Sequence, residues 1–409
     1  MAANAQTNLQ ALLLKQSGSN GLDLKKLAVQ IAARQRLRHK LPTWVANPDL
    51  VFPQTVSVEQ ASSEQTARYK AGVVAKTTST PPAHLIDGTG GMGVDTWAFA
   101  GVAQRVTYLE RDADLAQLAQ HNLPLLGCTN ATVLNTQSDL FLTSLTAPVD
   151  WIYLDPARRD SRGARVAQLD ACEPNVVAWW PMLQARSTHI LLKTAPLIDL
   201  EATIRQLPNI QAIHVVAVQH EVKEVLFVAG TGPILPDDIL ITAVDMTSTG
   251  EVTFTFRRAD ERSVSVPLRD PAQYLYEPNA AILKAGAFRA VAARFGLTKL
   301  AAHSHLYTSE TLINAFPGRT FRVEAVCKPS RSELQAYVPT LKANLTVRNF
   351  PQTVEDLRKK LSLKEGGDQY VFATTLQNGD KRLLVTSKVA SDRIITNFTP
   401  NTIPREQNQ

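Results

Sequence analysis

The fold is decided by His84-Leu85-Ile86-Asp87-Gly88-Thr89-Gly90-Gly91-Met92-Gly93, where an apolar strand runs into a loop rich in glycine. A loop with so few side chains lets its backbone approach a ligand closely. The pattern G-x-G-x-x-G, typical of dinucleotide binding after a strand, is satisfied by Gly88, Gly90 and Gly93. Because this pattern is short, the residues around it must decide what the loop holds.

Asp87 separates the ligands that this loop could bind. Its carboxylate ends the strand one residue before the first glycine, where it would face and repel the pyrophosphate of NAD or FAD. S-adenosylmethionine (SAM) carries an ammonium and a sulfonium and no phosphate, so an acidic residue suits it. We therefore expect SAM, with a dinucleotide or a purely structural turn as the alternatives.

Two further acids follow at predicted strand ends. Glu110 closes a predicted strand over 105–110, where a carboxylate can accept hydrogen bonds from both hydroxyls of a ribose. The same position would serve NAD, and a solvated acid is the structural alternative. Asp139 follows a predicted strand over 131–135 and could accept from the adenine amino group or only cap a helix. Asp112 is the predicted N-cap of a helix over 113–123.

A second informative stretch is Asp150-Trp151-Ile152-Tyr153-Leu154-Asp155-Pro156-Ala157-Arg158-Arg159, a hydrophobic strand that ends in Asp-Pro. Ligands of open α/β sheets bind at the carboxyl edge, where this strand delivers Asp155. Proline fixes its own φ and restricts the residue before it, so the carbonyls of Asp155 and Ala157 can be held toward a flat substrate.

Together these motifs resemble those of the class I SAM-dependent methyltransferases, which have a Rossmann-like α/β domain with a seven-stranded sheet. The first motif of that superfamily is matched by 87–93, the second by Glu110, and the fourth by Asp155-Pro156. Amino-methylating members carry Asp-Pro-Pro-aromatic or Asn-Pro-Pro-aromatic at the fourth motif. The cofactor-binding residues predicted in this way are Asp87, Thr89, Gly90, Gly91, Gly93, Glu110 and Asp139. The predicted catalytic residues are Asp155, Pro156, Ala157 and Arg158.

The fourth motif departs from the amino-methylating pattern, because Ala157 replaces the second proline and Arg158 replaces the aromatic residue. Asp-Pro-Ala-Arg resembles the corresponding motif of the RNA uridine C5-methyltransferases, which attack uracil with a cysteine placed just after strand five. That segment, 189–196, has no thiol here, so covalent pyrimidine methylation is disfavoured. The three cysteines, Cys128, Cys172 and Cys327, lie in none of the motifs.

Direct transfer to a nitrogen or oxygen remains, and there the enzyme mainly aligns the reactants and stabilises charge. Asp155 would orient or deprotonate an exocyclic amine of a purine. Lys193 could neutralise a carbonyl or phosphate of the substrate, or it could be a solvated or paired charge. Arginines crowd the loop after Pro156 and could grip phosphate, with a solvated loop paired to nearby aspartates as the alternative. These arginines are Arg158, Arg159, Arg162 and Arg165.

Composition indicates a multi-domain enzyme with an anionic partner. The chain has 409 residues, 44% of them hydrophobic, and a net charge of +6. Basic clusters at 34–40, 328–331 and 358–360 favour nucleic acid over membrane. No apolar run of membrane-spanning length and no signal-peptide pattern is present, and the three cysteines form no CxxC pattern. We therefore expect a soluble, cytoplasmic enzyme without metal, and the sequence leaves its oligomeric state open.

The predicted domains are an N-terminal helical region at 1–70, a methyltransferase domain at 71–260, a ferredoxin-like α+β segment at 271–320, a THUMP-like domain at 321–395 and a disordered tail at 397–409. Helices are predicted at 9–14, 22–37, 62–71, 281–295 and 354–361. Further strands are predicted at 188–193, 211–218, 224–229, 239–246, 252–257, 321–326, 344–348, 369–375 and 382–387. The pair 211–218 and 224–229 is expected to form a hairpin.

The C-terminal part resembles the THUMP-like domain attached to a group of bacterial class I methyltransferases. The resemblance is carried by 276–279, 347–351 and 366–370. THUMP domains proper are RNA-binding modules of tRNA-modifying enzymes, so the resemblance implies structured RNA, tRNA or rRNA, as substrate. Arg348 beside Phe350 offers a charge together with a stacking face, although both could be structural. The leading hypothesis is a SAM-dependent RNA methyltransferase. The alternatives are a small-molecule or protein methyltransferase and a non-catalytic RNA-binding protein.

Overall fold

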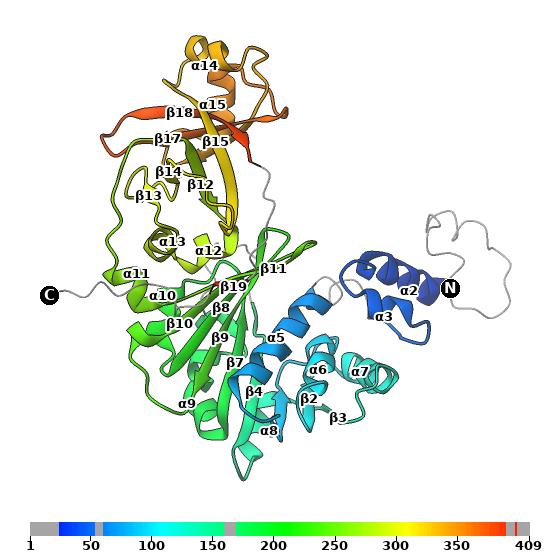
Figure 1. Ribbon diagram of the computed structural model, residues 1–409. Coiled ribbons are helices and arrows are strands. Elements are labelled where there is room, and N and C mark those ends of the chain that lie inside the picture. Colours follow the sequence, from blue (N-terminus) through cyan, green and yellow to red (C-terminus); the bar gives the residue numbers. More distant parts are fainter. Residues whose placement is uncertain (1–23, 54–59, 159–168, 390–396, 399–409) are drawn as a thin grey trace. The chain divides into compact units, whose positions relative to one another are not determined.

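The computed structural model describes residues 24–53, 60–158, 169–389 and 397–398 (Figure 1). The chain forms two compact units, one made of 1–210 and 226–233, the other of 211–225 and 234–409. Several sequence predictions fall outside the described residues. They are the helix at 9–14, the substrate-binding roles of Arg159 and Arg162, the nearby Arg165, and the tail from 399 onward.

The first unit is built on a sheet in which the strands follow the order β9-β7-β4-β1-β2-β3. The central strand β1 pairs in parallel with β2 and β4, so that Asp87 lies opposite Tyr108 on one side and Tyr153 on the other. β3 continues the parallel sheet beside β2, and β7 continues it beside β4. The acidic strand tips therefore meet at one edge. The strands are β1 (Leu85–Asp87), β2 (Val106–Glu110), β3 (Ala131–Asn135), β4 (Val149–Leu154), β7 (Ser187–Thr194) and β9 (Glu221–Gly230).

Helices connect these strands, and side-chain caps fix where several of them begin. The oxygen of Ser63 accepts from the Thr66 N–H at 3.1 Å at the start of α5. Asp112 accepts from the N–H groups of Asp114 and Leu115, which confirms the predicted N-cap of α7. The helices of this unit are α5 (Glu64–Thr77), α6 (Val94–Ala100), α7 (Ala113–Leu125), α8 (Ser138–Ser144), α9 (Val176–Arg186) and α10 (Leu200–Gln206).

The N-terminal helices α2 (Leu24–Leu37) and α3 (Pro42–Ala46) are held to the same unit by polar contacts. Arg34 donates to four carbonyls between Val45 and Leu50 at 2.8 to 3.0 Å. Its guanidinium therefore has a structural role, although the sequence places it in a basic cluster. Asn122 of α7 donates to the Val51 carbonyl at 2.7 Å and accepts from the Val51 N–H at 2.9 Å.

The second unit begins with β8 (Ile210–Val218), which pairs in parallel with β10 (Leu240–Thr247), itself antiparallel to β11 (Gly250–Arg257). The turn between β8 and β9 consists of Gln219 and His220, with φ of 51° and 66°. Two positive φ values are typical of a type I′ hairpin turn, so the predicted hairpin forms with a shorter loop than expected. Asn397 and Phe398, at the start of the predicted disordered tail, form β19 beside β11.

A seven-stranded sheet, in the order β13-β14-β12-β15-β18-β17-β16, forms the rest of the second unit. β16 and β17 match the predicted strands, and α15 matches the predicted helix. The predicted single helix over 281–295 is wrong: the chain forms α12 and α13 instead. Gly286 ends α12 with φ 77°, a left-handed position that terminates helices. The elements are β12 (Tyr274–Pro278), α12 (Ala280–Ala285), α13 (Phe288–Phe295), β13 (Thr298–Lys299), β14 (Tyr307–Ser309), β15 (Gly318–Cys327), α14 (Arg331–Tyr337), β16 (Asn344–Arg348), α15 (Val354–Leu361), β17 (Gln369–Thr375) and β18 (Lys381–Lys388).

Candidate active site

The glycine loop after β1 is held by backbone hydrogen bonds to both neighbouring strands. The Gly88 N–H donates to the Tyr153 carbonyl at 2.9 Å, and the Gly90 N–H donates to the Leu109 carbonyl at 3.0 Å. A Cβ on Gly90 would lie 2.1 Å from the ring of Tyr108, so this glycine is required by packing inside the protein. Over Gly91, which has φ +53°, the nearest atom to an added Cβ is 3.9 Å away, which leaves room for a ligand.

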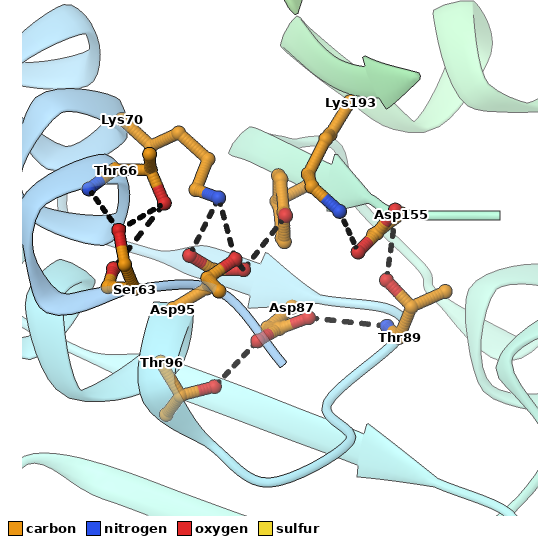
Figure 2. A network of polar contacts seen from close by, with 11 residues as sticks. Ser63, Thr66, Lys70, Asp87, Thr89, Asp95, Thr96, Asp155 and Lys193 are labelled. Carbon is orange, nitrogen blue, oxygen red and sulfur yellow. Dashed lines mark hydrogen bonds and ion pairs between the residues drawn. The ribbon is translucent and has the colours of Figure 1, made fainter. Parts of the chain in front are cut away.

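Asp87 is completely buried beneath this loop. Its carboxylate accepts from the Thr89 N–H at 3.1 Å and from the Thr96 hydroxyl at 2.6 Å (Figure 2). Burial raises the pKa of Asp87 to about 7, against the opposing effect of the Thr96 hydrogen bond. One oxygen therefore holds Thr89 of the loop and the other holds Thr96 of α6, in an environment where the negative charge is poorly compensated.

Glu110, at the tip of β2, lies beside the same loop. One carboxylate oxygen accepts from the Gly91 N–H at 2.9 Å, and the other accepts from the Asp112 N–H at 2.9 Å. Each carboxylate oxygen has two lone pairs, so the fixed side chain can still accept hydrogen bonds from a pair of hydroxyls.

Asp139 lies in the first turn of α8, where its Oδ1 accepts from the N–H of Leu140 at 2.9 Å. The N-cap of this helix is Gln137, which makes no side-chain cap hydrogen bond. The neighbouring Ser138 hydroxyl donates to the Gly88 carbonyl and so ties the start of α8 to the glycine loop.

Asp155 and Lys193 form an ion pair at the tips of β4 and β7 (Figure 2). The Asp155 N–H donates to the Thr89 hydroxyl at 2.7 Å, which links this pair to the glycine loop. The two side chains are 31% and 16% exposed, so the pair is accessible from solvent but partly shielded. The structure therefore brings Lys193, which the sequence left open between a binding and a paired role, directly onto the carboxylate of the fourth motif.

A buried polar network that the sequence analysis did not identify lies next to these groups. The Lys70 ammonium of α5 lies 2.9 Å from Asp95 of α6 and donates to the Ser62 hydroxyl at 2.7 Å. The hydroxyls of Ser62 and Tyr153 both donate to Asp95 at 2.8 Å. Burial acts to raise the pKa of Asp95, but the charges of Lys70 and Lys193 and the hydrogen bonds outweigh it and hold that pKa below its usual value.

The residues after Pro156 form a short strand, β5 (Ala157–Arg158), which pairs antiparallel with β6 (Cys172–Glu173). Arg158 lies opposite Cys172, so the pairing brings a buried thiol beside the fourth motif. Glu173 forms an ion pair with Arg111 at 2.5 Å, which ties this strand pair to the loop after β2. The sequence separation concealed this neighbour of the motif.

Arg348 and Phe350 lie in the second unit and have partners within it. Arg348 lies 2.8 Å from the Glu277 carboxylate, which also accepts from Arg319 and is only 4% exposed. Phe350 is half-buried and packs against the core cluster that contains Leu345. Both residues therefore contribute to the fold of this unit.

The charges at the edge of the first sheet fit the cofactor expected from the sequence. Carboxylates lie at the tips of β1, β2 and β4, and Gly91 provides an open, side-chain-free surface next to them. A cationic ligand with a ribose suits this set better than a pyrophosphate does. Within the described ranges, no group of three or more His, Cys, Asp or Glu residues could hold a metal ion. None of the described helices is long and apolar enough to cross a membrane.

Comparison with known proteins defines the class. Residues 274–317 match the model of a ferredoxin-like domain, and 318–388 match that of a THUMP domain-like family. A protein from Porphyromonas gingivalis W83, solved as a candidate methyltransferase, is 36% identical over 95% of this chain and 96% of that chain, with a TM-score of 0.85. An uncharacterized SAM-dependent methyltransferase of Mycobacterium tuberculosis (strain CDC 1551 / Oshkosh) is 24% identical over 334 residues, 79% of this chain and 84% of that protein.

These similarities extend over both units and agree with the parallel sheet and its acidic glycine loop. The chain belongs to the family of bacterial class I SAM-dependent methyltransferases that carry a C-terminal THUMP-like domain.

Proposed function

We propose that the protein methylates RNA, tRNA or rRNA, at a base nitrogen such as a purine exocyclic amine. The observation that carries this proposal is the Asp155–Lys193 ion pair beside the glycine loop. It offers a carboxylate acceptor for an amine, and a fixed cation next to it, at the edge where ligands of such sheets bind.

The cofactor-binding roles proposed for the loop follow from its charges. Gly91 offers the open surface and Glu110 the acceptors for the ribose hydroxyls. Asp87 is buried, so it would act on the ammonium or sulfonium through its charge and by holding Thr89 in place. The proposed cofactor residues are Asp87, Thr89, Gly90, Gly91, Gly93, Glu110 and Asp139.

Bound SAM supplies an electrophilic methyl group on its sulfonium. Oδ2 of Asp155 is the oxygen in the ion pair, so Oδ1 can accept a hydrogen bond from a substrate amine, orient the nitrogen lone pair and take the proton that the nitrogen loses on methylation. Pro156 fixes the backbone that follows, and β5 holds Ala157 and Arg158 against β6. Lys193 keeps the carboxylate from rotating away and stabilises negative charge on the substrate.

The RNA substrate rests on the THUMP-like domain and on the net charge of +6. The proposed substrate-binding residues are Arg159, Arg162, Lys193, Arg348 and Phe350. The domain boundaries predicted from the sequence and a cytoplasmic location are part of the same proposal.

A small-molecule or protein substrate is the second candidate, and one observation favours it. The ion pair of Arg348 with Glu277 and the packing of Phe350 against the core engage the two residues expected to meet RNA in the second unit. The first unit would then act on a substrate that needs no RNA surface.

Labelled methyl transfer tests the function directly. The full-length protein is incubated with methyl-labelled SAM and RNA from cells that lack the gene, and the nucleosides are separated by mass spectrometry. We expect label in one methylated purine that is missing from those cells and present in the parent. Label that survives ribonuclease and remains with protein or small molecules would refute the RNA assignment.

Asp155→Asn and Arg205→Gln are the matched variants. Asp155→Asn keeps the shape of the side chain and removes its charge, so we expect methyl transfer to fall by about a hundredfold while SAM binding persists. Arg205 is exposed on α10 and has no proposed role in binding or catalysis, so its variant should retain full activity. A parental rate in Asp155→Asn would contradict the proposed role of Asp155.

A further inference from the structure

The second unit contains a cavity of about 540 Å³, wide open to solvent, that the proposed methyl transfer does not use. It lies among α11 (Arg258–Ser263), α13, β13 and the segment that follows β13. A volume of this size accommodates a nucleotide-sized ligand. The side chains that line it are mostly basic or aromatic: Glu261, Arg262, Phe288, Arg289, Lys299, His303 and His305.

Lys299 is the central cation of this cavity. The residue is only 6% exposed, and its ammonium donates to the Ala302 carbonyl at 2.6 Å. An ammonium has three N–H groups, so further donors remain. The carboxylate that acts on Lys299 is that of Glu261, whose negative charge stabilises the ammonium. Burial, together with the charge of Arg289, lowers the pKa of Lys299 in spite of the charge of Glu261.

The carboxylate in the cavity, that of Glu261, already accepts hydrogen bonds from the protein backbone. Glu261 accepts from the N–H of Arg289 at 2.7 and 2.9 Å and from the N–H of Ala290 at 2.9 Å, so it caps the start of α13. The guanidinium of Arg289 is exposed, and its recorded hydrogen bond goes to the Arg262 carbonyl at 3.4 Å. Arg262 is paired with Asp237 at 2.7 Å. Arg289 and Lys299 are therefore the cations that a ligand would meet, beside the single carboxylate of Glu261, whose charge acts on both of them.

His305 lies in the same cavity, close to its cations. Its ring stacks on Phe288 with the centroids 3.7 Å apart, and its buried Nδ1 has no hydrogen-bond partner among the described residues. Burial lowers the pKa of His305 to about 4, and the cations that lower it further are Lys299, His303 and Arg348. The stacked pair supplies a flat aromatic wall next to the cations.

We infer that this cavity binds the phosphate group of a nucleotide, with Arg289 and Lys299 as the cations and the Phe288–His305 pair as the wall for the base. The phosphate would accept from further N–H groups of these two side chains, beside the carbonyls of Ala302 and Arg262 that they already contact. The inference does not depend on which substrate is methylated, because it concerns a separate set of residues.

Calorimetry on the full-length protein tests the inference. The protein is first saturated with S-adenosylhomocysteine, so that adenosine compounds cannot enter the cofactor site. Inorganic phosphate, adenosine 5′-monophosphate (AMP) and adenosine are then titrated separately. We expect heat with phosphate and tighter binding of AMP, and none with adenosine. Adenosine binding as tight as that of AMP would overturn the inference.

Arg289→Gln removes an exposed charge and should weaken AMP binding about tenfold, the loss of one charge-assisted hydrogen bond. Lys299→Met should have at least that effect, with thermal unfolding of the full-length protein, followed by circular dichroism, as the check that the second unit folds. Arg205→Gln, on α10 of the first unit, is the matched control and should bind AMP as the parent does. Unchanged AMP affinity in Arg289→Gln would refute the site.

The source of the phosphate is resolved by competition. An RNA oligonucleotide with a 5′-phosphate is compared with the same oligonucleotide ending in a hydroxyl. Displacement of AMP by the phosphorylated oligonucleotide alone assigns the cavity to an RNA end. AMP binding without displacement by either assigns it to a free nucleotide. Displacement by both oligonucleotides equally would refute recognition of a terminal phosphate.

Discussion

Asp87 and Asp95 are both buried in the first unit, and their carboxyl groups have opposite pKa shifts. Asp95 lies against the Lys70 ammonium, which lowers its pKa in spite of burial. Among the described residues, Asp87 has a hydroxyl and an N–H as side-chain partners, and burial raises its pKa to about 7. The protein thus compensates the charge of Asp95, which joins α5 and α6, and leaves the charge of Asp87 beneath the glycine loop uncompensated. A cationic ligand can supply the compensation that Asp87 lacks.

The largest expected effect comes from breaking the compensated acid. Lys70→Met would leave Asp95 as a buried carboxylate that keeps its hydroxyl donors but loses its ion pair, so we expect the first unit to lose about 3–5 kcal/mol of its free energy of unfolding. Thermal unfolding followed by circular dichroism measures this loss as a fall in Tm. The double variant Lys70→Met/Asp95→Asn also removes the buried negative charge, so it should recover much of the loss in Tm. An unchanged Tm in the single variant would show that the ion pair contributes little.

Packing inside the glycine loop gives the next effect. Gly90→Ala would bring a Cβ to 2.1 Å from the Tyr108 ring. We expect this overpacking to cost about 1–3 kcal/mol and to weaken binding of S-adenosylhomocysteine, measured by calorimetry. Gly72 is the matched control, because it lies in α5 with nothing within 4 Å of an added Cβ. Gly72→Ala should keep the affinity and raise stability by about 0.5–1 kcal/mol. Equal affinity in both variants would contradict the role of Gly90.

Asp155, which the sequence placed correctly at a strand end, and Gly90, whose role it misassigned, show how far the sequence could predict this site. The alternation of apolar strands, acids and glycines is local, so it predicted β1 to β4, the cap of α7 and the residues gathered at the sheet edge. The sequence pattern assigned the loop glycines to ligand binding. Gly90 is instead required because a side chain there would clash with the ring of Tyr108, a residue of the neighbouring strand. That reason depends on strand register, which the sequence does not display.

Other residues of the site were missed by the sequence analysis for the same reason. Lys70 and Asp95 lie on different helices, and nothing in either helix marks them as partners until both are folded. Cys172 reaches the fourth motif only because β5 and β6 pair. In contrast, the break between α12 and α13 was visible in the sequence as Gly286, but the apolar periodicity on either side concealed it.

The smallest expected effect is a change in SAM affinity with pH, which tests whether the charge of Asp87 is uncompensated. A bound cation favours the ionised form of Asp87, so below pH 7 binding must release a proton and the affinity for SAM falls. With the pKa of Asp87 at about 7, we expect SAM to bind about fivefold more weakly at pH 6 than at pH 7, measured by calorimetry. Asp87→Asn, which cannot ionise, should bind SAM more weakly at pH 7 and show no such dependence.

The stability of the same variant should move in the opposite direction. The raised pKa means that the folded protein binds the Asp87 proton more tightly than the unfolded chain does. The stability linked to this proton is present in acid and is lost as the pH rises through about 7. Asp87→Asn should therefore match the parent in Tm near pH 4, where both side chains are neutral, and exceed it at pH 8. If the variant lost Tm at pH 8 as well as affinity, Asp87 would be a structural acid like Asp95, and the contrast between the two carboxylates would not mark the ligand site.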